Sequence, residues 1–176
     1  MSPSLTTPLP ANAALRCRLD APLCALVLVV DTRDGRLRHV YVPGQRHAPV
    51  VEAVTEVPPT HPALQPAVAA VQAWWSGRGA TDADPRLSTV GTPLQQAVWQ
   101  ALRAIPPGQT RTYGDVAAAV GRPRAVRAVA QAVARNPWLL LVPCHRVVGQ
   151  DGTLTGFAAG LPLKQALLDW EGLPPG

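Results

Sequence analysis

A short segment with the composition of a linker divides this chain of 176 residues into two parts of different character. It runs from Ser76 to Ser88, and glycine, aspartate and proline within it favour turns over helices or strands. These residues are Gly77, Gly79, Asp82, Asp84 and Pro85. We therefore predict two domains, residues 1–87 including the linker and residues 88–176. Because 47% of the residues are hydrophobic and 15% are charged, both parts are expected to fold.

The first part alternates apolar runs with turn signals. Three runs predict strands, at residues 15–19, 23–30 and 37–42. The pair Asp34-Gly35 between the last two predicts a hairpin. After a loop rich in proline, residues 64–75 predict a helix, since one face carries Leu64, Val68, Val71 and Trp75. The first part is therefore expected to be an α/β domain.

The second part opens with a strong helix start. Thr92-Pro93-Leu94-Gln95 places a capping threonine before a proline in the first turn and a glutamine at the third helical position. This helix is expected to end at Pro106-Pro107-Gly108. A second helix is predicted from Asp115 to Val120, and Gly121 would end it.

A third helix is predicted from near Pro123 to about Arg135, with one apolar and one basic face. The apolar face carries Val126, Val129, Ala130 and Val133, and the basic face carries Arg124, Arg127, Gln131 and Arg135. Two helices joined by a glycine-containing turn, the second with an arginine face, are typical of a helix-turn-helix. The alternative is a solvated charged face.

The net charge is distributed unevenly between the two parts of the chain. Of the net charge of +5, residues 1–87 contribute +1, from eight Arg against seven Asp and Glu. Residues 88–176 contribute +4, from seven Arg and one Lys against four Asp and Glu. The basic surplus thus lies in the second part, which permits a polyanionic partner.

No segment suggests targeting or membrane insertion. Residues 1–15 lack the basic start of a signal peptide, and the run Leu23–Val30 is far shorter than the roughly 20 residues that span a bilayer. We expect a cytoplasmic protein. Cys17, Cys24 and Cys144 are too few for a disulfide framework. A zinc site of Cys17 and Cys24 with His39 or His47 is an alternative, but no metal or cofactor is expected.

One motif carries possible chemistry, Pro143-Cys144-His145-Arg146-Val147. A cysteine becomes nucleophilic when its thiolate is favoured, and a nearby histidine oriented by a carboxylate can favour it. Neighbours on an extended chain point to opposite sides, so a bridging water or a bend after Pro143 would be needed. The motif alone also fits a buried structural cysteine.

Residues 91–172 resemble the active-site domain of the O6-alkylguanine-DNA alkyltransferases, and the Pro-Cys-His-Arg-Val run is that family's signature. Further matches follow in order along the chain. They are Gly91-Thr92-Pro93, Ile105-Pro106, Gly108, Tyr113-Gly114, Gly121, Pro123, Arg127-Ala128-Val129, Asn136-Pro137, Thr155-Gly156 and Glu171-Gly172. The first part of the chain matches only in its expected architecture. The resemblance implies an α/β fold, with a ribonuclease-H-like sheet and helix domain followed by a helical domain with a winged helix-turn-helix.

The resemblance also implies a reaction and its residues. Cys144 would accept an alkyl group from guanine irreversibly, His145 would deprotonate it through a water, and Glu171 would orient the histidine. Asn136 would brace the turn, and Tyr113 would hydrogen-bond the flipped base and help to protonate it. The DNA-binding residues would be Arg127, which enters the base stack, with Arg124, Ala128 and Arg135. Residues of the base pocket would be Tyr113, Val147, Phe157, Ala158 and Lys164.

Two departures from the family pattern fall in that pocket. Phe157 stands where tyrosine is common, and Ala158-Ala159 stands where a small residue and glycine are usual. The methyl group of Ala159 is expected to disfavour bulky alkyl groups, unless both changes are neutral. The expected partner is double-stranded DNA with alkylated guanine, bound by a monomer, and O4-alkylthymine is a possible further substrate. Two other functions stay open: a damage sensor of the alkyltransferase-like kind, against which Cys144 argues, and a thiol hydrolase.

Overall fold

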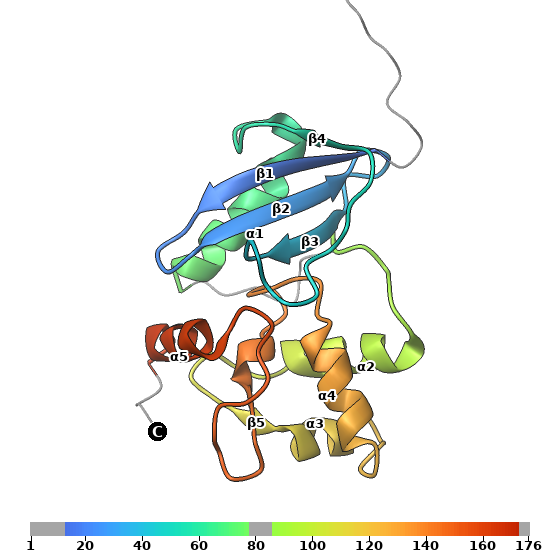
Figure 1. Cartoon of the computed structure of the whole chain (residues 1–176), viewed down its shortest axis with the longest axis vertical. Helices are drawn as coiled ribbons and strands as arrows, with labels where there is room; N and C mark the ends of the chain where they lie inside the picture. Colours follow the sequence, from blue (N-terminus) through green and yellow to red (C-terminus); the bar gives the residue numbers. More distant parts are fainter. Residues whose placement is uncertain (1–12, 78–85, 173–176) are drawn as a thin grey trace, which may run out of the picture.

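A computed structural model describes residues 13–77 and 86–172. Within these ranges the fold is mixed α/β, with a four-stranded sheet, a two-stranded sheet and five α-helices. Figure 1 shows the larger sheet with α1 across one face, and the helices α2 to α5 gathered below the sheet in the view, beyond β3. No helix of the described part has both the length and the apolar character needed to cross a membrane.

The larger sheet is formed by the first part of the chain. Its strands are β1 (Ala14–Asp20), β2 (Ala25–Asp31), β3 (Leu37–Tyr41) and β4 (Val54–Glu56), in the order β3-β2-β1-β4. The pairs β1–β2 and β2–β3 are antiparallel, which confirms the predicted hairpin, and β4 is parallel to β1. Gly35 adopts a φ of 69° in the hairpin turn, where L-residues are disfavoured. The strand β4 was not predicted because three residues give no readable alternation.

The helix α1 (Gln65–Trp75) confirms the helix predicted over residues 64–75 and follows a 3₁₀ turn at Pro62–Leu64. Val68 and Val71 are buried on this helix as predicted, and so is Leu64, which lies in the 3₁₀ turn before it. The fourth predicted member, Trp75, is half-buried and packs against the core, and Trp74, which was not predicted, is more deeply buried, with 5% of its surface exposed. Trp74 follows Val71 by three positions, so it shares the same stripe of the helix.

Two of the helices in the second part begin with capping boxes. In α2 (Pro93–Arg103) the Thr92 hydroxyl accepts from the Gln95 amide, and the Gln95 side chain accepts from the Thr92 amide, as predicted. In α3 (Tyr113–Ala119) Thr112 and Asp115 make the same exchange, so the helix begins at Tyr113 and not at Asp115 as predicted. Thr112, which directly precedes α3, is also the last residue of β5 (Arg111–Thr112). The strand β5 pairs in parallel with β6 (Val147–Val148).

The third predicted helix is α4 (Val126–Ala134), shorter at both ends than expected. Its buried residues are Val129, Ala132 and Val133, whereas Val126 is 38% exposed. Including Val126 in the apolar face was therefore wrong, because the first three residues of α4, at 126–128, are all exposed. The last helix, α5 (Leu161–Trp170), ends one residue before Glu171.

The two parts of the chain share one apolar core. It contains Leu28 and Val40 from the sheet, Val71 from α1, and Val129 and Leu167 from the helical part. The two-domain division therefore stays a prediction. Of the linker residues on which it rests, Gly79, Asp82, Asp84 and Pro85 lie outside the described residues.

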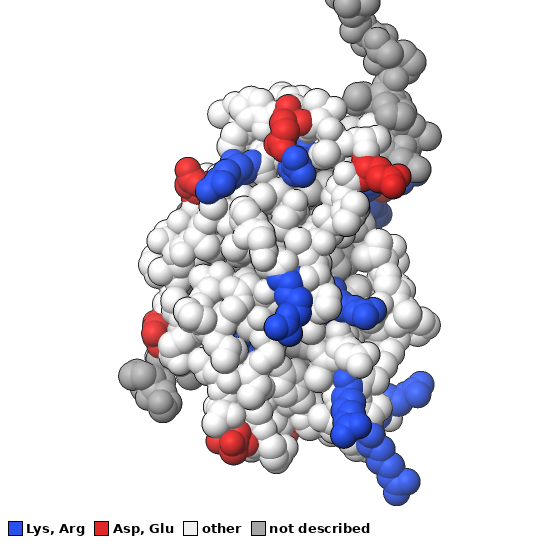
Figure 2. Space-filling view, in the orientation of Figure 1, with Lys and Arg blue, Asp and Glu red and all other residues white. Residues whose placement is uncertain are grey.

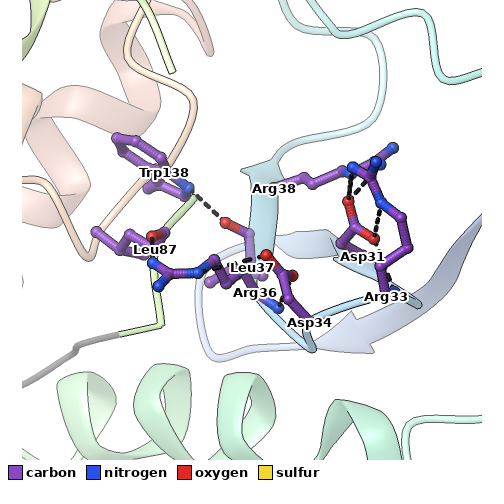
Figure 3. A network of polar contacts seen from close by, with 8 residues as sticks. All are labelled: Asp31, Arg33, Asp34, Arg36, Leu37, Arg38, Leu87 and Trp138. Atoms are coloured by element: carbon purple, nitrogen blue, oxygen red, sulfur yellow. Dashed lines mark hydrogen bonds and ion pairs between the residues drawn. The ribbon is translucent and has the colours of Figure 1, made fainter. Parts of the chain in front are cut away.

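Hydrogen bonds at the edge of β3 join the sheet to the segment that precedes Cys144. The Val40 amide donates to the Pro137 carbonyl at 2.8 Å, and the Leu139 amide donates to the Val40 carbonyl at 2.9 Å. The indole of Trp138 donates to the Leu37 carbonyl at 2.9 Å, as Figure 3 shows. The backbone that leads to the cysteine thus continues the sheet.

The hairpin between β2 and β3 is itself held by ion pairs, which Figure 3 also shows. The buried carboxylate of Asp31 pairs with both Arg33 and Arg38. Arg36 donates to the Leu87 carbonyl at 3.2 Å, across the linker. The hairpin thereby anchors the end of the linker at Leu87 as well as the Trp138 segment.

Candidate active site

The cysteine lies on a tight turn and not on an extended strand. A 3₁₀ helix spans Cys144–Arg146, directly after Pro143 and the buried apolar segment that ends at Val142. The Cys144 amide donates to the Val142 carbonyl at 2.8 Å. The bend after Pro143 that the motif required is present.

Asn136 ties this turn to the end of α4. Its Nδ2 donates to the Val142 carbonyl at 2.7 Å and lies 3.2 Å from the Sγ of Cys144. Its Oδ1 accepts from the Trp138 amide at 2.9 Å. Asn136 and Cys144, eight residues apart, are thus brought into contact, with Asn136 9% and Cys144 6% exposed.

His145 and Glu171 are also brought together, 26 residues apart in the chain. The Nε2 atom of His145 lies 2.9 Å from Oε1 of Glu171, so the imidazole carries its proton on Nε2 and donates it to the carboxylate. The other ring nitrogen, Nδ1, is buried and has no hydrogen-bond partner among the described residues. Its lone pair is therefore available as a proton acceptor.

Arg146 completes this group, and sequence reasoning did not single it out. Its guanidinium donates to both oxygens of Glu171, at 2.9 Å from Nε to Oε2 and 2.6 Å from Nη2 to Oε1, and to the Ile105 carbonyl. Although burial alone would raise it, hydrogen bonds from His145 and Arg146 hold the pKa of Glu171 at about 2. The only sequence signal was the position of Arg146 within the Pro-Cys-His-Arg-Val run.

Burial decides the resting charge of the cysteine and histidine. Burial raises the pKa of the Cys144 thiol, and the Asn136 amide and the Lys164 ammonium oppose that shift. Burial also lowers the pKa of His145, against the effect of Glu171. At neutral pH the site therefore holds a thiol next to a neutral imidazole, so the thiolate must be generated by proton transfer.

A second group of site residues surrounds the loop at 153–160. The Tyr113 hydroxyl lies 3.2 Å from the Thr155 carbonyl and 3.3 Å from that of Gly156, and burial raises its pKa. Lys164 is fully buried, and its ammonium donates to the carbonyls of Val147 and Thr155. Lys164 thus ties this loop, at Thr155, to the strand β6, at Val147.

The two departures from the family pattern lie on the same loop. Phe157 is buried, and the Lys164 ammonium lies 6.0 Å from its ring centroid. The Ala158 carbonyl accepts from the Arg46 amide at 2.9 Å, so the connection between β3 and β4 holds this loop from the sheet side. Ala159 is half-buried against the core.

The predicted DNA-binding arginines lie apart from this group, on the outer surface around α4. Arg124, Arg127, Ala128 and Arg135 are all exposed. They do not share one helix as predicted: Arg124 precedes α4, and Arg135 is its C-cap. Figure 2 shows basic side chains gathered over the lower part of this face, beside α3 and α4, with the acidic side chains of the face lying apart from them.

The alternative zinc site is not formed. Among the described residues, no three His, Cys, Asp or Glu side chains are grouped so that they could hold a metal ion. Cys17 is buried in β1 and Cys24 is half-buried, and burial raises the pKa of both thiols.

Comparisons with known proteins agree on one family. The family model described as "6-O-methylguanine DNA methyltransferase, DNA binding domain" matches residues 93–173. A methylated-DNA–protein-cysteine methyltransferase of Methanosarcina acetivorans is 53% identical over 89 residues, which are 51% of this chain and 57% of that protein. The chain thus spans little more than half of that relative. A protein of the same name from Mycobacterium tuberculosis is 39% identical over 157 residues, covering 87% of this chain and 89% of its own.

Solved structures are similar over most of the chain. The crystal structure of the Mycobacterium tuberculosis O6-methylguanine methyltransferase superposes with a TM-score of 0.76 and 36% identity, covering 93% of this chain and 96% of that one. A structure of the same enzyme in complex with DNA also gives 0.76, with 89% and 92% covered. The O6-methylguanine-DNA methyltransferase of Pyrococcus kodakaraensis, 24% identical with a TM-score of 0.68, shares the fold. The chain therefore belongs to the methylated-DNA–protein-cysteine methyltransferase family.

Proposed function

We propose that this protein repairs DNA by a single, irreversible transfer of an alkyl group from the O6 atom of guanine to the Sγ atom of Cys144. One observation carries this proposal. The buried Cys144 thiol lies 3.2 Å from the Asn136 amide, and the next residue, His145, is hydrogen-bonded through Nε2 to Glu171. The relatives that are named for this activity supply the substrate class.

The first step is formation of the thiolate. The free Nδ1 of His145 accepts the thiol proton through a bridging water, and Glu171 stabilises the imidazolium that results. The Asn136 amide donates to the developing thiolate. Arg146 keeps Glu171 ionised and in place.

The second step forms the S–C bond and breaks the bond between the alkyl carbon and O6. The electron pair of the broken bond passes to guanine, which takes up a proton from the Tyr113 hydroxyl. The proton that His145 took from the thiol returns to Tyr113 through water, so the net movement is one proton from the thiol to guanine. The product is a thioether on Cys144 and an unmodified guanine. Water and thiols do not readily cleave a thioether, so each chain acts once.

Access to O6 requires that the base leave the duplex. Flipping costs a few kcal/mol, which Arg127 would offset by entering the space that the base leaves. Arg124, Ala128 and Arg135 would contact the backbone of double-stranded DNA, which explains their exposure around α4. In this proposal α3 and α4 form a winged helix-turn-helix, the sheet domain is ribonuclease-H-like, and the protein acts as a monomer in the cytoplasm.

The flipped base is held by the loop at 153–160 and by the segment after Cys144. Main-chain groups at Val147 and Ala158 would hold the guanine edge, beside Tyr113 and Phe157. Lys164 would shape this pocket through the carbonyls of Val147 and Thr155, to which it donates. O4-alkylthymine is a further candidate substrate for the same pocket.

The stoichiometry of transfer tests the proposal. Excess duplex DNA carrying labelled O6-methylguanine is incubated with the protein, and label on the protein is counted over time. We expect a plateau at one methyl group per chain. Continued turnover, or release of label as methanol, would refute single transfer and favour a hydrolase.

A further inference from the structure

Three of the five tryptophans form a chain of edge-to-face contacts that ends on the buried active-site histidine. The ring centroids of Trp170 and Trp75 are 5.3 Å apart, those of Trp75 and Trp74 are 4.7 Å apart, and those of Trp74 and His145 are 5.7 Å apart. The interplanar angles are 84°, 86° and 83°. We call Trp74, Trp75 and Trp170 the tryptophan clamp.

The clamp joins the two parts of the chain. Trp74 and Trp75 are the last two residues of α1, and Trp170 is the last residue of α5. In Figure 1 the C-terminal end of α1 lies next to α5. Exposure falls along the clamp, from 46% at Trp170 through the half-buried Trp75 to 5% at Trp74.

The inner end of the clamp acts on the ring of His145. That ring has one hydrogen bond, from Nε2 to Glu171, while Nδ1 has no partner among the described residues. One bond leaves the ring free to tilt about the Nε2···Oε1 axis unless packing prevents it. Trp74 supplies an edge-to-face contact, which has a preferred orientation and therefore fixes the plane of the imidazole.

The outer end of the clamp acts on the partner of His145. Glu171 directly follows Trp170 and is the C-cap of α5. The contact between Trp170 and Trp75 therefore holds the end of α5, and with it the carboxylate, against α1. Two adjacent residues of α1 thus bear on both members of the His145–Glu171 hydrogen bond.

From this arrangement we propose that Trp74 and Trp75 are positioning residues that aim the free Nδ1 of His145 at the Cys144 thiol. The inference rests on the proposed function, in which His145 takes the thiol proton. It gives the sheet and helix part of the chain a role in the reaction.

The test compares Trp74→Leu with Trp74→Phe, which keeps an aromatic edge. Three quantities are measured on the full chain: the single-turnover rate of transfer from duplex O6-methylguanine at saturating DNA, the DNA affinity, and the ¹⁵N signals of the His145 imidazole, assigned with His145→Gln. We expect Trp74→Leu to lower the rate about 10- to 100-fold, because small misplacements of a reacting group have effects of this size. The His145 signals should move toward exchange between tautomers, the DNA affinity should stay unchanged, and Trp74→Phe should restore most of the rate.

Val68→Ala is the matched control, since it removes buried packing from the same helix without touching the clamp. It should lose stability but keep the wild-type rate and His145 signals. Wild-type rate and signals in Trp74→Leu would overturn the inference. If Trp74→Leu does not fold, Trp75→Leu takes its place, with disturbed His145 signals supporting the inference and unchanged signals refuting it.

The proposed function can be refuted independently of the inference about the tryptophan clamp. A wild-type protein that accepts no methyl group would refute the alkyl transfer itself. The His145 signals in the clamp variants, which do not depend on transfer, would then decide whether the clamp positions the ring.

Discussion

The side-chain amide of Asn136 donates at once to the carbonyl that precedes the active-site turn, at 2.7 Å, and to the Sγ atom of Cys144, at 3.2 Å. A single residue, two positions after the last residue of α4, therefore both shapes the turn and faces the nucleophile. Because α4 is also the helix around which the exposed arginines lie, Asn136 joins the proposed DNA-binding surface to the thiol.

Asn136→Ala should slow transfer and raise the pH at which it becomes fast. The Asn136 amide lowers the pKa of Cys144 against the effect of burial, so its loss raises that pKa and leaves less thiolate at neutral pH. The Val142 carbonyl also loses a donor, which should cost roughly 1–3 kcal/mol of the free energy of unfolding. Rate against pH and chemical denaturation measure both effects. Gln100→Ala, at an exposed position of α2, is the control, and an equal effect there would contradict the assignment to Asn136.

Because of Glu171, the free energy of unfolding should decrease as the pH falls into the acidic range. Its pKa is lowered from 4.5 to about 2 in the folded protein, so it stabilises the fold above pH 4.5, and that stabilisation is lost as the pH falls toward 2. The shift corresponds to on the order of 3 kcal/mol. Glu171→Gln lacks this contribution and leaves Arg146 without its carboxylate, so it should be less stable at neutral pH. The difference in unfolding free energy between wild type and variant should shrink between pH 5 and pH 2, and a constant difference would contradict this account.

Charge reversal at the arginines around α4 should weaken DNA binding without regard to sequence. Arg124→Glu and Arg135→Glu should each reduce the slope of log affinity against log salt by about one, if each arginine contacts one phosphate. Arg18→Glu, in the exposed part of β1, makes the same charge change and should leave the slope unaltered. Arg127→Ala should instead lower the transfer rate from duplex DNA much more than from the free base. Equal losses on both substrates would mean that Arg127 does not fill the vacated stack.

Ala159→Gly should widen the range of alkyl groups. Removal of one methyl group from a tight wall relieves overlap only for a large ligand, so benzyl transfer should speed up while methyl transfer stays nearly constant. The ratio of the two rates is compared between wild type and variant. Phe157→Tyr on the same loop serves as the control, because it adds a hydroxyl group without removing any side-chain atom from the pocket. An unchanged ratio in Ala159→Gly would show that Ala159 does not line the alkyl pocket.

Local signals in the sequence were enough to predict much of the fold. The capping box of Thr92 and Gln95 and the hairpin around Asp34-Gly35 are interactions between near neighbours, and both are confirmed. Boundaries set by more distant packing were predicted less well. Val126 looked apolar but lies in the exposed first turn of α4, and β4 is defined only by its pairing with β1.

The site required a different kind of information. No periodicity connects Cys144 to Asn136 or His145 to Glu171, and the resemblance to a family named all four residues. Arg146 and the tryptophan clamp were not predicted, because their roles arise from contacts between segments that fold together. The contact of Trp74 with His145 joins residues 71 positions apart, and no local pattern encodes it.

The central claim is that Cys144 itself receives the alkyl group, and intact-mass spectrometry with peptide mapping tests it most directly. After the protein is mixed with duplex DNA that carries O6-methylguanine, we expect a gain of one methyl group per chain, located on Cys144. Cys144→Ala should show no gain while it still binds the DNA. A methyl group found only on Cys17 or Cys24, or a gain that persists in Cys144→Ala, would contradict the account.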